Sequence, residues 1–218
     1  MESSHYFKVA VEGNIGCGKS TFLKFFEGIS PNIEISLEPI ELWNNVKGHK
    51  LFEIFYGEPL KWSTPFESQV MVTFLNRQTK PQMAPVRLME RSIHSGRCCF
   101  IEAMNQNKQI SDDDLAVIDE FYRWGRELPS AKLDLIVYLR CSPEVCAERI
   151  RKRDRAGEQA ISMEYLQQLH DLHERLLLDG VTDSCPAPVL IFDCDKPLEI
   201  LTNVYYESRE QVMCGVKV

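Results

Sequence analysis

The sequence lacks the features of several protein classes. It has no run of about 20 apolar residues, the length that a membrane-spanning helix requires. It has no Cys-x-x-Cys pair, and the His-x-x-His spacing at His170 and His173 has no cysteine pair with it, so no structural zinc site is predicted. Internal repeats and low-complexity tracts are also absent. We therefore expect neither a membrane partner, nor a zinc module, nor a repeat architecture.

The cysteines do not fit a secreted disulfide framework. They are scattered, and several stand inside apolar runs: Cys17, Cys98, Cys99, Cys141, Cys146, Cys185, Cys194 and Cys214. This pattern predicts free, buried thiols in a reducing compartment. The first expected strand begins near residue 7, which leaves no room for a signal or transit peptide. We expect a cytoplasmic or mitochondrial protein, the latter if a presequence was removed before Met1.

Composition and charge favour a folded protein that does not bind nucleic acid. The 218 residues are 44% hydrophobic and 26% charged, enough to bury one sizeable core. The formal net charge of -7 is unsuited to non-specific binding of a phosphate backbone. A small anionic ligand held by a local basic cluster remains compatible with it.

Short apolar runs alternate with stretches that suit helices. Strands are expected near residues 7–11, 33–37, 86–89, 133–139 and 189–192. Helices are expected to begin at Lys19, at Thr64-Pro65 (running to about Lys80), at Ser111, at Ser142-Pro143 and at Ser162, with another from Pro197 onward. This alternation predicts an α/β protein with a parallel five-stranded sheet flanked by helices, in a single domain over residues 1–218.

A phosphate-binding loop is the strongest motif. The run Gly13, Asn14, Ile15, Gly16, Cys17, Gly18, Lys19 and Ser20 satisfies G-x-x-x-x-G-K-S between an expected strand and an expected helix. Its backbone N–H groups would bind the phosphates of ATP, with Lys19 bridging two phosphates and Ser20 holding Mg²⁺. A chance glycine-rich turn is the alternative. A switch GTPase is not favoured, because the Asn-Lys-x-Asp element that reads guanine is absent.

Charged residues stand where strands are expected to end. Glu38 follows one strand, and Glu90 and Arg91 follow the next. Ligands of open parallel sheets bind at the carboxyl ends of strands. One carboxylate can take a proton from an attacking hydroxyl while another helps to hold Mg²⁺. Solvated helix or strand caps are the alternative for isolated residues of this kind.

A basic cluster ends the helix that Ser142-Pro143 opens. It contains Arg149, Arg151, Lys152, Arg153 and Arg155. Near a phosphate loop, such arginines can clamp a phosphoryl group in transfer. A solvated helix face is the alternative, and the spacing puts Arg149 with Arg153 and Arg151 with Arg155 on separate faces.

Together these strings resemble the deoxyribonucleoside kinase family. The matching segments are residues 12–16 (EGNIG), 38–39 (EP), 43 (W), 89–93 (MERSI), 138–140 (YLR), 142–144 (SPE) and 169–174 (LHDLHE). The resemblance implies a P-loop kinase fold with an arginine-rich lid at about residues 150–160. It also implies ATP-dependent 5′-phosphorylation of deoxyribonucleosides in nucleotide salvage, a homodimer, and feedback by a deoxynucleoside triphosphate.

The resemblance also implies residue roles. Glu38 would be the base facing the 5′-hydroxyl, held by Arg91, and Glu90 would act with Ser20 at Mg²⁺. Tyr56 and Glu158 match the positions that hold the 3′-hydroxyl. The family's positions that form the walls around the nucleobase correspond to Trp43, Val70, Phe100 and Met104, and Phe100 would stack on the base. The lid matches Arg149, Arg151, Arg153 and Arg155. Ordinary core packing is the alternative for Tyr56 and for the aromatics Trp43, Phe74 and Phe100.

Three positions depart from the family pattern. Glu67 stands where the family has glutamine, Phe74 where thymidine-type members have methionine, and Gly96 where they have alanine. The deoxycytidine-type arginine and aspartate are absent from the last two positions, which predicts a pyrimidine-favouring, thymidine-like enzyme. We expect Glu67 to face the base and to weaken thymidine use, because an ionised carboxylate only accepts hydrogen bonds. Three alternatives stay open: a protonated Glu67 that mimics the amide, a preference for guanine, or a Glu67 that points to solvent.

Two rival functions are weighed against this one. A nucleoside monophosphate kinase would need arginines for the acceptor phosphate, and the pocket segments before residue 90 supply only Arg77 and Arg87. A non-catalytic scaffold of the same fold would tolerate the loss of Lys19, Glu38 or Arg91, and all three are present.

Overall fold

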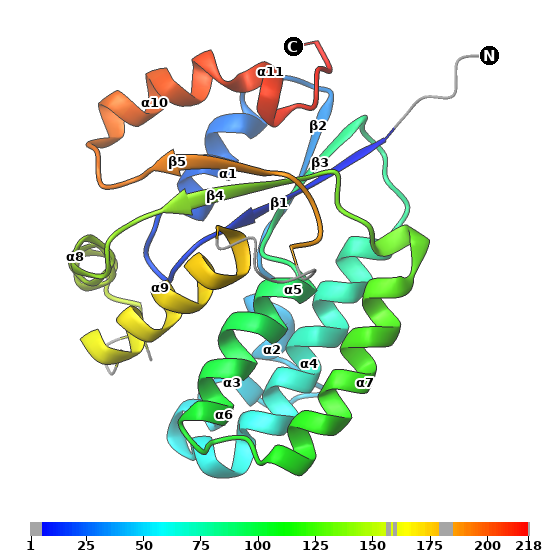
Figure 1. Ribbon diagram of the computed structural model, residues 1–218, viewed down its shortest axis with the longest axis vertical. Helices are drawn as coiled ribbons and strands as arrows, with labels where there is room; N and C mark the ends of the chain where they lie inside the picture. Colours follow the sequence, from blue (N-terminus) through cyan, green and yellow to red (C-terminus); the bar gives the residue numbers. More distant parts are fainter. Residues whose placement is uncertain (1–5, 156–157, 159–160, 179–184, 218) are drawn as a thin grey trace.

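The computed structural model describes residues 6–155, 158, 161–178 and 185–217. Within them, five strands form one parallel sheet in the order β2-β3-β1-β4-β5 (Figure 1). The strands are β1 (Phe7–Glu12), β2 (Ile33–Ser36), β3 (Val86–Glu90), β4 (Leu135–Arg140) and β5 (Val189–Asp193). The predicted α/β class with a five-stranded parallel sheet is confirmed.

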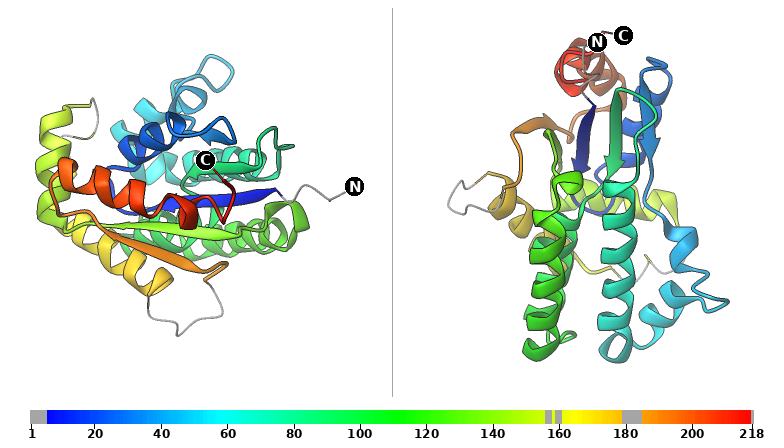
Figure 2. Two further views of the ribbon diagram at one scale, coloured as in Figure 1. Left: turned by 90° about the horizontal axis from the view of Figure 1, so that it is seen from above. Right: turned by 90° about the vertical axis from the view of Figure 1, so that its right-hand side faces the viewer.

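Helices cover both faces of this sheet. They are α1 (Lys19–Glu27), α2 (Ile40–Trp43), α3 (Leu51–Gly57), α4 (Pro59–Thr79), α5 (Ile93–Ser95), the π-helical η1 (Gly96–Ile101), α6 (Glu102–Gln106), α7 (Asp112–Glu127), the 3-10 turn η2 (Pro129–Ala131), α8 (Pro143–Arg153), α9 (Met163–Leu177), α10 (Leu198–Glu207) and α11 (Arg209–Val212). The long helices α4 and α7 lie side by side and extend past one end of the sheet (Figures 1 and 2).

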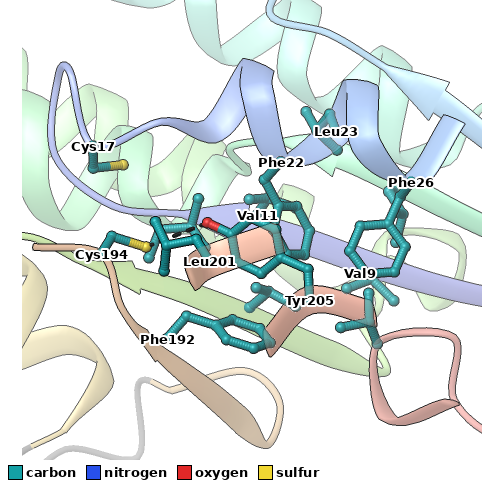
Figure 3. Close-up of a cluster of buried hydrophobic side chains, with 14 of the residues drawn as sticks. Val9, Val11, Cys17, Phe22, Leu23, Phe26, Phe192, Cys194, Leu201 and Tyr205 are labelled. Carbon is teal, nitrogen blue, oxygen red and sulfur yellow. Dashed lines mark hydrogen bonds between the residues drawn. The ribbon is translucent and has the colours of Figure 1, made fainter. Parts of the chain in front are cut away.

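Strand alternation divides the core between the two faces of the sheet. Val9 and Val11 of β1 pack with Phe22 of α1 and Tyr205 of α10 in one cluster (Figure 3). Ala10, between them in sequence, packs on the opposite face against the leucines of α9. Successive side chains of a strand point to opposite faces, and both faces of β1 are buried, as a parallel sheet covered by helices requires.

A third cluster lies beyond the sheet, among α2, α3, α4, η1, α6 and α7. It is rich in aromatic residues, among which Trp43, Phe55, Phe66 and Phe74 are buried. Phe55 and Phe66 stack in parallel with ring centroids 4.5 Å apart. This cluster forms an apolar wall that faces the carboxyl ends of β2 and β3.

One predicted boundary is wrong. The helix expected to begin at Thr64-Pro65 begins at Pro59, so Pro65 lies inside α4. The additional first turn is held by tertiary packing, because Ser63 is buried and Trp62 packs against the aromatic cluster. The hydroxyl of Thr64 donates to Asp114 of α7 and does not cap a helix. Packing against neighbouring helices therefore outweighs the helix-start signal that proline gives.

The expected helix starts at Ser111, Ser142-Pro143 and Ser162 and the free cysteines are confirmed. Ser111 and Ser162 are N-caps whose side chains accept from the backbone N–H groups of Asp114 and Tyr165. Ser142 precedes α8, although its hydroxyl donates to Asp195. All eight cysteines are free. Among the described residues there is no group of three or more potential metal-binding side chains of His, Cys, Asp or Glu, and none of the described helices has the length and apolar character needed to cross a membrane.

Candidate active site

A cavity of about 720 Å³ opens at the carboxyl ends of the strands. Loops after β1, β2 and β3 form one side of it, and the aromatic cluster forms the other. The cavity brings together most of the residues that the sequence singled out: Ile15, Gly16, Lys19, Ser20, Glu38, Trp43, Tyr56, Glu67, Val70, Phe74, Glu90, Arg91, Gly96, Phe100, Met104, Arg153, Arg155 and Glu158. In an open parallel sheet, this edge is where ligands bind.

The loop between β1 and α1 has the shape of a phosphate cradle. Gly13, Gly16 and Gly18 all have positive φ angles. A Cβ at Gly13 would lie 2.6 Å from the carbonyl oxygen of Leu139, so no side chain fits there. Lys19 begins α1, and its buried Nζ donates to the carbonyls of Gly13 (3.2 Å) and Asn14 (2.8 Å). The loop thus presents a lysine and a helix N-terminus to an anion.

Ser20 and Glu90 meet at the edge of this loop. The Ser20 hydroxyl donates to the Glu90 carboxylate at 3.1 and 3.3 Å. A hydroxyl and a carboxylate are oxygen ligands of the kind that Mg²⁺ prefers, usually together with phosphate oxygens and water. These two residues therefore fit a magnesium ion that accompanies a nucleotide.

Glu38 and Arg91 form an ion pair in the lining of the cavity. The Arg91 Nε and the Glu38 Oε1 lie 3.1 Å apart. Arg91 is buried, and its Nη1 also donates to the Gly13 carbonyl at 3.0 Å. Its guanidinium lies over the Phe100 ring, 4.3 Å from the ring centroid. The Glu38 side chain is one-fifth exposed, so its carboxylate is oriented by Arg91 and still reaches the cavity.

Arg91 adopts a strained backbone conformation. Its φ of 62° lies in the left-handed region, which non-glycine residues rarely occupy. Its backbone N–H donates to the Val11 carbonyl of β1, so the residue stays tied to the sheet as the chain leaves β3. Such strain is typical of functional sites, where surrounding contacts hold it in place.

The basic cluster divides between two locations. Arg153 and Arg155 line the cavity, and both donate to the buried carboxylate of Glu158. Arg149 instead donates to the carbonyls of Cys17 and Cys194, beneath the phosphate loop, and Arg151 is exposed. Of the four arginines that the resemblance places in the lid, two line the cavity in this structure. Residues 156–157 and 159–160 of the predicted lid lie outside the described residues.

Tyr56 lies in the cavity wall on α3. Burial, and secondarily the charge of Glu158, raise the pKa of the Tyr56 hydroxyl to about 12. The tyrosine therefore stays neutral and can donate a hydrogen bond to a ligand near neutral pH. Together with Glu158 it offers both a donor and an acceptor to a small polar group such as a sugar hydroxyl.

The far end of the cavity is apolar. Trp43 and Phe74 line it and also belong to the aromatic cluster, so each serves both as core and as wall. The Trp43 indole N–H is satisfied by Thr73 at 3.0 Å. A Cβ at Gly96 would lie 3.3 Å from the Met71 Sδ and 3.5 Å from the Phe74 ring, so a larger residue there would press first on Met71.

One carboxyl group interrupts this apolar end. Glu67 of α4 is 3% exposed and lines the cavity, so it does not point to solvent. Its Oε2 is buried and has no hydrogen-bond partner among the described residues. Burial, and secondarily the negative charge of Glu38, raise the pKa of Glu67 to about 8, against the opposing effect of Arg91.

Sequence reasoning missed several cavity residues. Tyr165, Asn107, Gln109, Phe52 and Phe66 also line it. Tyr165 stands three residues after the Ser162 cap, so the helix-start signal at Ser162 could have placed it in the first turn of α9. Asn107 and Gln109 stand in the turn after α6 and carry no such signal.

The two arginines considered as ligands of an acceptor phosphate, Arg77 and Arg87, both bind other groups of the protein. Arg77 donates to the carbonyls of Ser36, Leu37 and Glu90, where it ties α4 to the ends of β2 and β3. Arg87 pairs with Glu34 and donates to three carbonyls at the end of α4 and just after it. Neither lines the cavity.

A family model for deoxynucleoside kinases matches residues 9–217. The chain belongs to the deoxynucleoside kinase family. This assignment confirms the resemblance seen in the sequence, and it makes the fold a P-loop kinase fold and the protein an enzyme of this family.

Named relatives agree with this family assignment. Human mitochondrial thymidine kinase 2 is 38% identical over 205 residues, which cover 94% of this chain and 77% of that protein. Chicken deoxycytidine kinase 2 is 31% identical over 218 residues, covering 87% of this chain and 82% of the relative. Mouse deoxycytidine kinase is 31% identical over 224 residues, covering 89% and 86%. Relatives of this deoxynucleoside kinase thus include both thymidine and deoxycytidine kinases.

The buried Glu67 predicts a pH-dependent stability. Its pKa rises from 4.5 to about 8 on folding, so between these values the folded protein binds more protons than the unfolded chain. Stability must then fall as the pH rises through this window, and the loss is complete above about pH 8. Glu67→Gln does not titrate and avoids this loss. The melting temperature of the variant should therefore exceed that of the wild type by a margin that grows from about pH 5 to about pH 8.

Thermal unfolding of the ligand-free proteins at a series of pH values measures this difference. Glu207→Gln is the matched control, because Glu207 is exposed at the end of α10, away from the cavity. A stability difference between Glu67→Gln and wild type that does not change with pH would contradict the raised pKa.

Proposed function

We propose that this deoxynucleoside kinase transfers the γ-phosphoryl group of ATP to the 5′-hydroxyl of a deoxyribonucleoside, favouring pyrimidines, in nucleotide salvage. It would do so as a single domain over residues 1–218. The observation that carries the proposal is the position of Glu38. Its carboxylate lines the cavity together with Lys19 and Ser20, and it pairs with Arg91, which binds the Gly13 carbonyl and lies over the Phe100 ring. An acceptor hydroxyl at Glu38 would therefore meet a donor phosphate held by the phosphate loop.

The cavity offers a separate subsite for each part of the two substrates. Lys19 and the loop Gly13–Ser20 would hold the ATP phosphates, and Tyr56 with Glu158 would hold the 3′-hydroxyl. The apolar end would take the nucleobase, against Trp43, Val70, Phe74, Gly96, Phe100 and Met104. This arrangement fixes both reactants, and positioning together with charge stabilisation supplies most of the catalysis of phosphoryl transfer.

Glu38 would act as the general base. It accepts the proton of the 5′-hydroxyl as the oxygen attacks the γ-phosphorus in line, and the bond from phosphorus to the leaving oxygen of ADP breaks. Arg91 holds Glu38 at 3.1 Å and keeps its carboxylate turned into the cavity. Arg153 and Arg155 also line the cavity, where they would neutralise charge on the phosphates.

Ser20 and Glu90 would hold the Mg²⁺ ion that accompanies ATP. When bound, that ion supplies charge neutralisation at the phosphate oxygens. The residues themselves support this role, since their oxygens already lie within hydrogen-bond distance of each other at the phosphate loop.

The geometry favours this reaction over its rivals. A nucleoside monophosphate kinase needs cations for the acceptor phosphate, yet Arg77 and Arg87 are turned away into carbonyls and Glu34. A non-catalytic scaffold has no need of the ion pair between Glu38 and Arg91, and backbone strain such as that of Arg91 is concentrated at functional sites.

Glu38→Gln is the test of the proposed base. The amide keeps the size of the side chain but cannot take up a proton, so kcat should fall by about 10²–10⁴-fold. The fold and the affinity for nucleoside should be retained, although the loss of the negative charge beside the buried Arg91 should lower the melting temperature. Glu41→Gln is the control, because Glu41 is exposed on α2, three residues away. Near-normal turnover of Glu38→Gln in a coupled ADP assay would contradict the assignment.

We also propose a homodimer. The support is a stripe of exposed apolar side chains on α7, formed by Val117, Phe121 and Trp124, each about 60% exposed. Their i, i+4, i+7 spacing puts them on one helix face, and an exposed apolar stripe of this kind marks an interaction surface. A second copy of this chain is the partner that the family resemblance implies.

Phe121→Glu should convert a dimer to a monomer. A charge in an apolar interface is costly to bury, so the variant should sediment at about half the mass of the wild type at micromolar concentration. Leu198→Glu makes the same change at an exposed apolar residue on α10 and should leave the mass unaltered. A wild-type chain that sediments as a monomer would contradict the proposal.

Two further proposals concern regulation and location. A deoxynucleoside triphosphate can inhibit by placing its base at the aromatic wall and its phosphates on the loop, because one continuous cavity joins the two. It should then compete with the nucleoside.

For location we propose the cytoplasm or the mitochondrion, and a relative named as mitochondrial supports the second.

A further inference from the structure

The Glu67 carboxyl is a polar group in the apolar end of the cavity. It projects from α4 in a wall that also contains Val70 and Phe74, and it is almost fully buried. Its Oε2 has no hydrogen-bond partner within the described part of the chain. Leaving a buried polar atom unpaired is costly, and carboxylates are seldom buried without a partner. The unpaired oxygen is therefore available to a ligand group.

No cation neutralises this carboxyl among the described residues. The titratable groups that face it are Glu38 after β2, Arg91 after β3, Tyr56 on α3 and Tyr165 on α9. Arg91 is the positive member of this set, and it is already bound to Glu38 and to the Gly13 carbonyl. The hydroxyls of Tyr56 and Tyr165 stay neutral, since burial raises the pKa of each.

We propose that Glu67 selects the nucleobase by its own protonation state. The inference rests on the proposed function, because it takes the aromatic end of the cavity as the base subsite. A protonated carboxyl presents one donor and one acceptor, whereas an ionised carboxylate presents two acceptors. The two forms therefore match different patterns of hydrogen-bonding groups on the edge of a base.

The pattern of each base decides which form binds it. Thymine presents N3–H as a donor beside O4 as an acceptor, and cytosine presents N3 as an acceptor beside its amino donor. Both patterns match the protonated carboxyl. Guanine presents N1–H and its 2-amino group, two adjacent donors, which match the ionised carboxylate. That same carboxylate would place an oxygen lone pair against O4 of thymine, a repulsive contact in a buried site.

Both forms are populated near neutral pH. The pKa of Glu67 is raised to about 8 by burial and by Glu38, so the protonated form predominates at pH 7 and the ionised form takes over above about pH 8. The enzyme should therefore prefer thymidine below that pH and shift toward deoxyguanosine above it. A glutamine at this position would show no such shift, because an amide keeps one donor and one acceptor at every pH.

The test compares kcat/KM for thymidine, deoxyguanosine and deoxyinosine at about pH 6.5 and about pH 8.5, on either side of the pKa. Deoxyinosine has the purine ring of deoxyguanosine without the 2-amino group. The ratio of kcat/KM for deoxyguanosine to kcat/KM for deoxyinosine therefore does not depend on base size. Effects of pH on Glu38 and on ATP also cancel in this ratio. In the wild type, the ratio of deoxyguanosine to deoxyinosine and that of deoxyguanosine to thymidine should each rise by at least about tenfold.

Two variants complete the experiment. In Glu67→Gln both ratios should stay constant with pH, and thymidine use at about pH 8.5 should exceed that of the wild type several-fold. Glu207→Gln should retain the wild-type pH dependence. Ratios that are flat in the wild type, or that shift equally in wild type and Glu67→Gln, would overturn the inference while leaving nucleoside phosphorylation intact.

Calorimetric binding of the three nucleosides without ATP separates this inference from the proposed reaction. A pH-dependent preference in binding, lost in Glu67→Gln, would support base selection even if phosphoryl transfer were absent. Failure of all three nucleosides to bind to the folded protein would overturn both the inference and the proposed function.

Discussion

The site depends on Arg91, which ties together the ends of three strands. It follows β3, its backbone N–H binds β1 at Val11, its Nη1 binds the Gly13 carbonyl after β1, and its Nε pairs with Glu38 after β2. These contacts hold the residue in a left-handed conformation that it would not otherwise adopt. The phosphate loop and the proposed base thus have a fixed separation, which is the geometric condition for in-line transfer of a phosphoryl group.

The structure gives two nearby carboxyl groups different environments. Glu38 has an arginine partner and partial access to the open cavity. Glu67 has no arginine partner and is almost fully buried in the cavity wall beside Val70 and Phe74, where its Oε2 has no hydrogen-bond partner among the described residues. Environment, more than residue type, therefore separates a group suited to proton transfer from a group suited to reading a ligand.

Much of this arrangement could be predicted from the sequence because local rules decide it. The spacing of Gly13, Gly18 and Lys19 defines the phosphate loop, and the parallel sheet brings Glu38 and Arg91 to one edge because each follows a strand. Other features depend on how helices pack. Neighbours distant in sequence hold the first turn of α4 and bury Glu67. Arg149 lies beneath the phosphate loop because it binds one such neighbour, the carbonyl of Cys194. No local pattern encodes these contacts.

Direct identification of the product would test whether ATP phosphorylates the 5′-hydroxyl of a deoxyribonucleoside in this cavity. The purified protein would be incubated with thymidine, ATP and Mg²⁺, and the products followed by phosphorus NMR and mass spectrometry. The expected products are thymidine 5′-monophosphate and ADP in equal amounts, with no further phosphorylation when thymidylate replaces thymidine. Conversion of thymidylate to its diphosphate without action on thymidine, or release of phosphate from ATP without any nucleotide product, would contradict this reaction.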